Sequence, residues 1–432
     1  MAMKKLMATI MSFAVAGTLL AGCSSSGNGS VDTTTSTNGA TDTSVSSDTA
    51  SSTPIELTVW GSQEDQEMIK KMCEDFAAAN TGKTYKFTYG VVSEADAKNE
   101  VLKDVSAAAD VFGFASDQTA ELVEAGALYR VTKNKEDIIA NNTEASISAA
   151  TVNGELYGYP SSSDTYFMYY DKSKFTEDEV QSLDTMLEKN IDGVTTNVAF
   201  DLDNGWYQCA FFFGAGCTLF GENGADPTQC TFNNDRGLLV GEYLIGLASN
   251  PKFGNNFDDG LVKAGFADGS LAAAISGTWN AAEIQASLGD NYAATKLPTF
   301  TMSNGEKVQM GGMANFKLVG VNSETKQPLE AMALAEWLTN YDNQLTRFKE
   351  RSFAPTNTTL ANDTAALSAN IAVSALAQQA QYATVQTSIP QSGNYWKPAE
   401  AFGQDLISGA VTKENLQSKL DAYVESILAT LS

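Results

Sequence analysis

The chain has 432 residues, of which 43% are hydrophobic and 18% are charged, and its 52 acidic residues outnumber 27 basic ones. The net charge of −25 argues against nucleic acid or an anionic membrane surface as a partner, because both repel an acidic protein. The chain has no histidine, which excludes Ser-His and Cys-His catalysis and zinc sites built on imidazole.

The first 22 residues, 1–22, have the pattern of an export signal. Lys4 and Lys5 precede an apolar run over residues 6–20, which is too short and ends too soon to predict a membrane span. The run closes on Leu20-Ala21-Gly22-Cys23, which resembles the lipobox of bacterial lipoproteins, where the cysteine carries the lipid. An ordinary secretory signal with an incidental cysteine is the alternative.

The segment that follows predicts a disordered tether. Residues 24–54 are mostly Ser and Thr, with three Asp and neither Lys nor Arg, so they have almost nothing apolar to bury. With the cysteine, this tether makes up residues 23–54. Residues 55–432 remain, which is enough for two lobes at ~100–200 residues each.

Residues 55–126 alternate between strand and helix patterns. We expect strands at 55–60, 86–89 and 109–114, and helices at about 65–79, 94–109 and 118–125. This alternation predicts a parallel α/β lobe. In such sheets ligands bind outside the carboxyl ends of the strands. The side chains expected at these ends are Trp60, Glu64, Phe114 and Asp117.

The stretch 156–172 has a small polar middle, 161–165, between two aromatic flanks. The second flank, which includes Tyr166, is typical of a strand. Pro160 biases Tyr159 toward an extended backbone. The stretch therefore predicts two extended segments that meet at a polar crossing containing Asp164. A plain strand, loop and strand within any α/β domain is the alternative.

The rest of the chain adds further elements. Residues 197–201 could form a strand, and 206–213 are apolar all round, which predicts a buried helix. Helical patterns are also expected at 237–247, 264–274, 331–341, where Trp337 is assigned to the core, and 414–431.

Four cysteines follow Cys23, and none lies in C-x-x-C spacing, so a metal knuckle is not expected. Cys73 and Cys209 are two of them. Cys217 and Cys230 flank an Asn-Gly turn, and a hairpin there would let them face each other and bridge. Free thiols remain the alternative, because bridging needs a specific Cα separation.

A series of short motifs follows a characteristic order along residues 55–432. They are a first strand ending in Trp, then ADVF, GALY, NGELYGYP, MYYDKSKF, ADGSLAAA, ISGTW, LPTF and finally IPQ followed by YW. Their order and spacing resemble the extracellular solute-binding proteins of carbohydrate ABC importers, specifically the maltose/maltodextrin-binding type.

This resemblance implies a two-lobed, periplasmic-binding-protein-like α/β fold with hinge crossings between the lobes. The first lobe is expected to hold residues 55–162 with 312–363, and the second 166–310 with 366–432. The crossings are expected near 161–165, 308–314 and 362–367.

The resemblance also implies a sugar site, in which aromatic rings stack on sugar faces and carboxylates and amides bind hydroxyls. Asp164 takes the place of a family Glu, Gln118 stands where a basic residue is expected, and Phe114 replaces a Trp. These departures leave the sugar and its length open. The expected sugar contacts are Trp60, Glu64, Phe114, Asp117, Asp164, Tyr166, Trp206, Tyr207, Trp279 and Trp396.

The implied function is a lipid-anchored binding protein on the outer face of the bacterial cytoplasmic membrane. It would capture maltose or maltooligosaccharides and deliver them to the permease subunits, as a monomer without catalytic residues, metal or cofactor. The chain has no P-loop motif, which fits an ATPase on another subunit. A secreted glycoside hydrolase with paired carboxylates is the alternative, because acids are plentiful. A signalling or adhesion lipoprotein with this fold is a third possibility.

Overall fold

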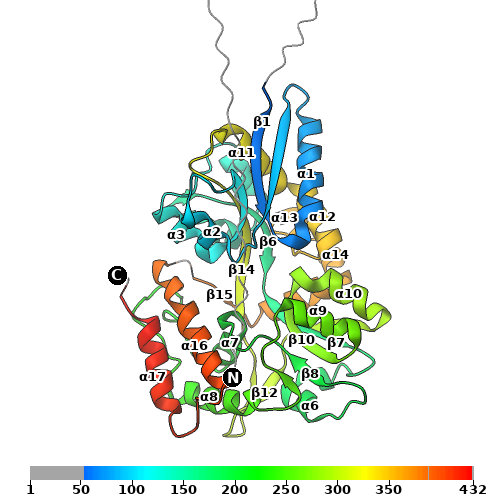
Figure 1. Ribbon diagram of the computed structural model, residues 1–432, viewed down its shortest axis with the longest axis vertical. Coiled ribbons are helices and arrows are strands. Elements are labelled where there is room, and N and C mark those ends of the chain that lie inside the picture. The colour runs from blue at the N-terminus through cyan, green and yellow to red at the C-terminus, as the bar shows by residue number, and fades with distance from the viewer. Residues whose placement is uncertain (1–52, 388, 431–432) are drawn as a thin grey trace, which may run out of the picture. The chain divides into compact units, whose positions relative to one another are not determined.

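The computed structural model describes residues 53–387 and 389–430. The expected signal segment, Cys23 and nearly all of the tether lie outside the described residues. None of the described helices is both long and apolar enough to cross a membrane. The described residues fold into two lobes, an upper one containing β1 and a lower one containing β10 in Figure 1.

The first lobe is built on a six-stranded sheet with the order β15-β14-β3-β1-β2, in which β6 also pairs with β14. β1 is parallel to both β2 and β3, as the sequence predicts, and β14 runs antiparallel to β3 and β6. The strands are β1 Ile55–Gly61, β2 Tyr85–Val91, β3 Val111–Ala115, β6 Tyr159–Asp164, β14 Met313–Val321 and β15 Thr384–Val385.

Helices cover this sheet and bury apolar stripes against it. On α1, Met68, Ile69, Met72 and Phe76 recur at helical spacing and face the core of the first lobe. The helices of this lobe are α1 Gln66–Ala79, α2 Ala97–Lys103, α3 Thr119–Glu124, α4 Lys135–Asn141, α5 Glu144–Ala149, α11 Pro328–Leu338 and α12 Tyr341–Arg351, beside a small β4 Thr151–Val152 and β5 Glu155–Leu156 pair.

The second lobe contains a five-stranded sheet with the order β11-β7-β10-β8-β9. Its central strand, β10, is buried along its whole length. The strands are β7 Tyr166–Asp171, β8 Thr196–Ala199, β9 Phe253–Gly254, β10 Leu271–Gly277 and β11 Tyr292–Thr295, with a separate β12 Thr299–Thr301 and β13 Lys307–Gln309 pair. The helices are α6 Leu183–Glu188, α7 Gly205–Gly214, α8 Asp235–Ala248, α9 Asp259–Asp268, α10 Ala281–Leu288, α15 Ile371–Ala380, α16 Trp396–Ile407 and α17 Leu416–Ile427.

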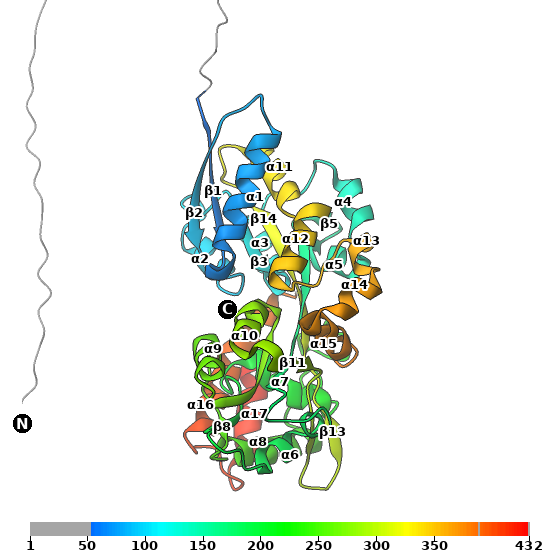
Figure 2. The ribbon, with the colours of Figure 1, turned by 90° about the vertical axis from the view of Figure 1, so that its right-hand side faces the viewer.

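The chain passes between the lobes where polar residues interrupt the extended segments. β6 belongs to the first sheet and β7 to the second, with Thr165 between them. The Thr165 hydroxyl donates to the carbonyl of Met313 on β14. Met313 packs in the core of the second lobe, whereas Phe316 packs in that of the first. Figure 2 shows the last passage, through α13 Thr358–Ala361 and α14 Thr364–Ala369 into α15.

Two expected helices differ from the structure. The helix expected at 264–274 ends at Asp268, where Gly269 adopts a left-handed backbone (φ 76°), and the alanines that follow form β10. Alanine suits this strand because β10 is packed between two neighbours and buried throughout. The helix expected at 94–109 is only the short α2, since its neighbours form turns, and Glu94 therefore lies in a loop.

The cysteines of the described residues, Cys73, Cys209, Cys217 and Cys230, are all free and buried. A backbone β-bridge between Leu219 and Cys230 closes a hairpin-like turn. No disulfide bond joins Cys217 and Cys230. Burial raises the pKa of Cys217 to about 11, so this thiol is protonated at neutral pH.

Candidate functional site

A cavity of about 870 Å³ lies between the two lobes. The first lobe contributes the loops after β1, β2 and β3, which is the carboxyl edge of its parallel strands. The second lobe contributes the start of α7, the end of β10 and the start of α16. Strands that run between the lobes supply the floor, with Asp164 on β6 and Asn315 and Lys317 on β14.

Four of the five aromatic side chains that line the cavity come from the second lobe, and the fifth, Phe353, follows α12. Trp206 is the second residue of α7, and its backbone NH is held by the Asn204 side chain at 3.0 Å. Trp396 opens α16 after a 3-10 turn, and its ring lies 5.2 Å from that of Tyr395. Together with Tyr207 and Trp279, these rings line the cavity and remain partly exposed except for Tyr207.

Trp279 is held by hydrogen bonds to both its side chain and its backbone. Its indole NH donates to Oδ1 of Asp259 at 3.1 Å, and its carbonyl accepts from Nη2 of Arg351 at 2.8 Å. A Cβ placed on Gly277 would lie 1.8 Å from Cζ3 of the indole, so the ring packs directly against the backbone of β10. This arrangement makes Trp279 a rigid platform whose position only glycine at 277 permits.

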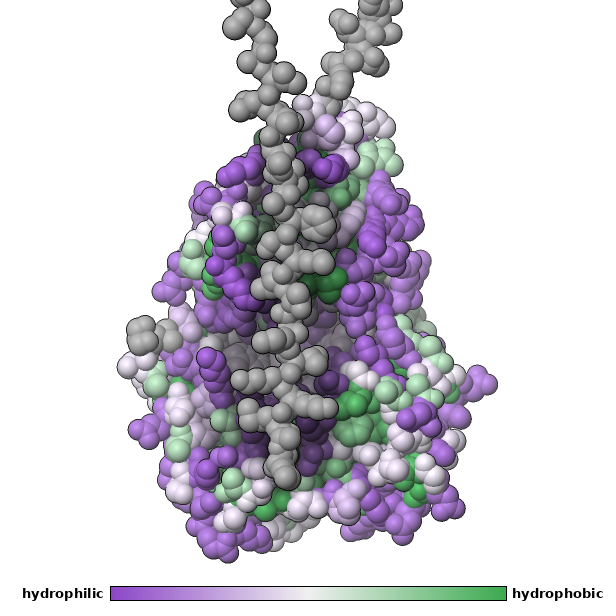
Figure 3. Space-filling view, in the orientation of Figure 1, coloured by the Kyte–Doolittle hydropathy of each residue, from purple (hydrophilic) through white to green (hydrophobic). Residues whose placement is uncertain are grey.

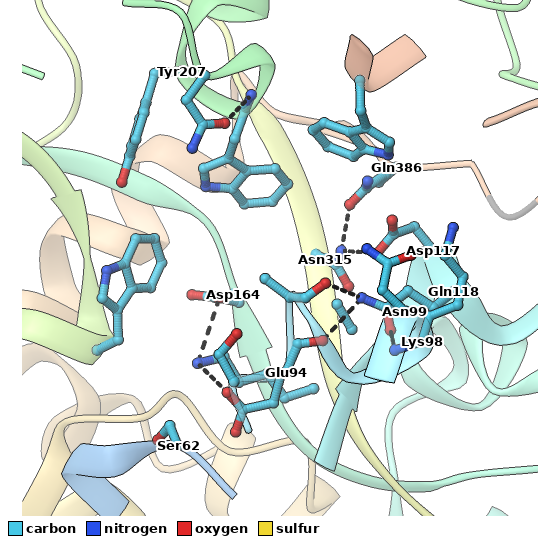
Figure 4. A pocket seen from close by; sticks show the side chains of 18 of the residues that line it. Ser62, Glu94, Lys98, Asn99, Asp117, Gln118, Asp164, Tyr207, Asn315 and Gln386 are labelled. Carbon is cyan, nitrogen blue, oxygen red and sulfur yellow. Dashed lines mark hydrogen bonds and ion pairs between the residues drawn. The ribbon is translucent and has the colours of Figure 1, made fainter. Parts of the chain in front are cut away.

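Asn315 joins three separate segments at one end of the floor. Its Nδ2 donates to Oδ1 of Asp117 at 3.0 Å and also to the side chain of Gln386. Its Oδ1 accepts from the backbone NH of Ser116 at 2.9 Å and from the Ser116 hydroxyl at 2.6 Å. Figure 4 shows Asn315, Asp117 and Gln386 gathered in this network. Burial raises the pKa of Asp117, and Asn315 opposes that rise by hydrogen bonding.

Two carboxylates and one ammonium lie at the centre of the floor. Nζ of Lys317 is 3.9 Å from Oδ2 of Asp164 and 4.0 Å from Oε2 of Glu94, and the dashed lines to these two carboxylates in Figure 4 mark the pairs. Burial raises the pKa of Asp164 to about 6, although Lys317 acts against the rise. Burial acts to lower the pKa of Lys317, but Glu94 and Asp164 outweigh it and hold that pKa above its ordinary value.

Ion pairs also connect the lobes beside the cavity. Arg351, the last residue of α12, pairs through Nε with Asp65 of the first lobe at 2.9 Å and through Nη1 with Glu283 of α10 at 2.9 Å. Lys263 of α9 reaches across to Glu64 at 3.1 Å. The lobes are therefore joined by side chains as well as by the crossing strands.

Seven of the ten expected contact residues line this cavity, and the other three lie outside its lining. Phe114 and Tyr166 are fully buried in the cores of the two lobes. Tyr166 packs behind the cavity, with its ring 5.3 Å from that of Trp206. Trp60 folds over Gly90 of the neighbouring strand, where an added Cβ would meet its ring at 2.4 Å. The seven are Glu64, Asp117, Asp164, Trp206, Tyr207, Trp279 and Trp396.

Several lining residues were not predicted from the sequence. Glu94 was placed within a helix, and Lys317 lies in an apolar strand, MANFKLVGV, where a lone lysine was the only signal. Asn315 shares its face of β14 with Lys317, because side chains two apart on a strand point the same way. The unpredicted charged or amide residues include Glu94, Lys98, Asn99, Gln118, Asn204, Asp259, Asn315, Lys317, Arg351, Gln386 and Lys397.

The outer surface of the molecule differs in character from the lining of the cavity. The face seen in Figure 3 is mainly hydrophilic, with hydrophobic residues scattered between polar ones. The lining instead brings aromatic faces, carboxylates, amides and the cationic side chains of Lys98, Lys317, Arg351 and Lys397 into a single cavity. Such a combination suits a neutral ligand that has both CH faces and many hydroxyls, because each kind of surface finds a partner.

Comparisons with known proteins agree with this geometry. The family described as bacterial extracellular solute-binding protein matches residues 71–375. A galactooligosaccharide-binding protein of Bacillus subtilis (strain 168) is 30% identical over 395 residues, which are 86% of this chain and 88% of the relative. The maltodextrin-binding protein MdxE of the same organism is 27% identical over 312 residues, which are 66% of this chain and 73% of the relative.

Solved structures show the same two-lobed fold. One protein solved with acarbose is 36% identical, with a TM-score of 0.80 over 87% of this chain and 99% of the other. The maltodextrin binding protein MalE1 from L. casei BL23, solved without ligand, is 25% identical, with a TM-score of 0.74 over 88% of this chain and 100% of the other. The chain belongs to the bacterial extracellular solute-binding protein family.

Proposed function

We propose that this chain is the substrate-binding lipoprotein of a carbohydrate ABC importer, and that it captures maltose or maltooligosaccharides between its lobes. One observation carries the proposal: Trp206, Trp279 and Trp396 share a cavity with carboxylates and amides from the facing lobe. Rings supply stacking area, and the polar groups satisfy hydroxyls that would be costly to bury unpaired. The cavity volume of about 870 Å³ is within the usual range for small-molecule sites.

The relatives support an oligosaccharide as the ligand class. They include binding proteins for maltodextrin, maltooligosaccharide and galactooligosaccharide, and a solved protein holding acarbose. An α-glucan is the ligand that most of these names share, and a galactooligosaccharide is the competitor. Closure of the lobes around the sugar would follow from contacts made only in the closed state.

We assign the sugar contacts to the expected residues that line the cavity. Trp206, Trp279 and Trp396 serve as stacking platforms, supported by the partly exposed rings they turn to the cavity. Asp117 and Asp164 accept hydrogen bonds from hydroxyls, and Tyr207 and Glu64 complete the two walls.

We also propose that Cys23 carries a lipid that holds the protein on the outer face of the cytoplasmic membrane, as a monomer that docks on the permease. The lipobox-like Leu20-Ala21-Gly22-Cys23 supports this assignment, as do two pneumococcal relatives named as lipoproteins. Replacing Cys23 with Ala should release the protein from the membrane fraction. Full retention of the variant on membranes would show that another element anchors it.

The proposed activity is binding without hydrolysis, and the alternative is a glycoside hydrolase. The test is a thermal-shift and calorimetry screen with maltose, maltotriose, longer maltodextrins, β-1,4-galactotriose and isomaltose. A ligand that binds only the folded protein raises its melting temperature. Chromatography of the recovered sugars should show intact ligand. Turnover of maltotriose would favour the hydrolase, and a well-folded protein that binds none of these sugars would refute the proposed ligand class.

A further inference from the structure

Lys317 is the one cavity residue whose position is defined by two neighbouring strands. Its backbone pairs with Ala115 of β3 on one side and with Ser162 of β6 on the other. The pairing with β6 shifts register between Lys317 and Leu318, so one strand carries an irregularity beside the cavity. Irregularities of this kind re-aim side chains at the edges of sheets and near binding sites. The direction of the Lys317 side chain is therefore built into the sheet.

The ammonium group of Lys317 lines the cavity and forms only long ion pairs. Its side chain is 14% exposed, and no residue of the described chain accepts a hydrogen bond from Nζ within 3.5 Å. The nearest carboxylate oxygens, on Asp164 and Glu94, are 3.9 and 4.0 Å away, which is too long for a direct hydrogen bond. Oδ1 of Asp164 is also buried and has no hydrogen-bond partner in the described residues.

Nζ of Lys317 and Oδ2 of Asp164 are therefore both free to bind a ligand group in the cavity. A hydroxyl suits both at once, since its oxygen accepts a hydrogen bond from the ammonium while its O–H donates one to the carboxylate. An oxygen about 2.8 Å from each group fits between atoms separated by 3.9 Å. A negatively charged ligand group would be repelled by the two carboxylates.

We propose that Lys317, Asp164 and Glu94 form a subsite that binds a hydroxyl of a neutral sugar, and that the Lys317 ammonium donates a hydrogen bond to that hydroxyl. This inference rests on the proposed function and assigns a role within it. The aromatic neighbours agree with it. Nζ of Lys317 lies 5.6 Å from the ring centroid of Trp279, so a sugar ring stacked on Trp279 brings the rim of its hydroxyls to the ammonium. Phe353, whose ring centroid is 4.7 Å from Nζ, also lines the cavity beside the ammonium.

The test measures affinity by calorimetry for Lys317→Met, which keeps the length of the side chain and removes its charge and donors. Maltotriose and β-1,4-galactotriose are the probes, and the one that wild type binds more tightly is used for all variants. We expect Lys317→Met to raise Kd at least tenfold, the scale of a lost hydrogen bond to a charged group. The matched control is Lys189→Met. Lys189 lies 5.3 Å from the Phe175 ring centroid and pairs with Glu179, outside the cavity, so its loss should leave Kd within twofold.

The variant with both Lys317→Met and Asp164→Asn keeps the test decisive if Lys317→Met alone fails to fold, because it removes both charges of the pair. If one hydroxyl bridges both groups, the double variant should lose little more affinity than either single variant. Wild-type binding with Kd unchanged in both Lys317 variants would overturn the inference and leave the proposed function standing. Absence of wild-type binding to either probe would overturn both.

Discussion

The two walls of the cavity have different chemistry. The strand-end loops of the first lobe contribute only polar or small side chains, whereas the second lobe contributes the tryptophans. The polar wall can read the hydroxyls of a ligand, and the aromatic wall can supply contact area to its rings. A ligand held this way needs both walls, so the difference favours a site that works only when the lobes are close together. The first-lobe side chains are Ser62, Glu64, Ser93, Glu94, Ala95, Lys98, Asn99, Ala115, Asp117 and Gln118.

The first lobe has aromatic residues at its strand ends as well, but it turns them away from the cavity. Phe114 occupies space beside Gly158 and Gly320, where an added Cβ would meet its ring at 3.3 and 3.0 Å. Trp60 covers Gly90 in the same manner. In the second lobe the glycine at 277 instead supports the back of Trp279, so the ring faces the cavity. The placement of glycines thus decides which wall becomes aromatic.

The largest expected effect is on the aromatic wall. Trp279→Ala should weaken sugar binding by about 2–4 kcal/mol, the scale of an aromatic anchor at the centre of an interface. Trp60→Ala is the matched control, because Trp60 packs between strands outside the cavity; it should lower the melting temperature and leave the affinity unchanged. Calorimetry and thermal melts separate the two outcomes. Equal losses of affinity in both variants would contradict the difference between the walls.

The next effect concerns Asp164 and depends on pH. Burial, supported by Glu94 and Asp259 and opposed by Lys317, raises the pKa of Asp164 to about 6 from an ordinary 3.8. Folding therefore favours the neutral form, so the stability that Asp164 contributes is fully present below pH 3.8 and is lost as pH rises through 6. Asp164→Asn does not lose this stability as pH rises, because its amide carries no titrating proton. Its melting temperature should exceed that of wild type at pH 7.5, and the gap should close toward pH 4.

Asp164→Asn should lower sugar affinity although it raises the melting temperature, because the ionised carboxylate accepts hydrogen bonds from hydroxyls. Asp164→Asn should lose about 1.5–3 kcal/mol of affinity at pH 7.5. Wild-type affinity should itself fall as the pH drops below 6. Titrations at pH 7.5 and pH 5 test both statements. A variant that is no more stable and binds as tightly as wild type would remove Asp164 from the site.

A smaller effect is expected at Gly277, which supports the platform without touching the ligand. Gly277→Ala places a methyl group 1.8 Å from the indole, so the Trp279 ring must move. We expect an affinity loss of about 1–2 kcal/mol, as for an overpacked site. Gly246→Ala is the control, because nothing lies within 4 Å of a Cβ at that position on α8. A shift in the tryptophan fluorescence of the Gly277 variant alone would locate the change at the ring.

The smallest effect is expected where the walls meet through an exposed ion pair. Lys263 and Glu64 have side chains 28% and 33% exposed, and pairs of this kind contribute roughly 0.2–1 kcal/mol. Lys263→Met should therefore weaken binding slightly at low salt, and not at all at 1 M salt. Glu64→Gln should add a salt-independent loss, because Glu64 also contacts the sugar, and equal salt-dependent losses in both variants would remove Glu64 from the contacts.

The sequence predicted the fold well because its elements are strongly patterned and ordered. The parallel β1, β2 and β3 and the strand after Asp164 all appear near their expected positions. One of the two exceptions, the alanine-rich 264–274, fits a helix and a buried strand equally well by composition. Gly269 marks the boundary, and only the neighbours of β10 decide the structure on its far side.

The site was predictable on one wall and not on its floor. Trp279 and Trp396 follow turns with small or polar neighbours, which distinguishes them from the core residue Trp337. Lys317 and Asn315 instead lie in an apolar strand, and their roles depend on partners far along the chain. Asn315 meets Asp117 across 198 positions, a contact that no local pattern encodes. The sequence alone therefore supplied candidate residues, whereas the structure was needed to show which of them lie together.

Arg351 connects Trp279 of the aromatic wall to a helix outside the cavity. It bonds the carbonyl of Trp279 and the carboxylates of both lobes, and it is the last residue of α12. The helix extends for 11 residues, about 16 Å, to Tyr341, whose side chain is exposed on the outer surface. One guanidinium thus connects the backbone of the Trp279 platform to a helix whose other end reaches the exposed surface.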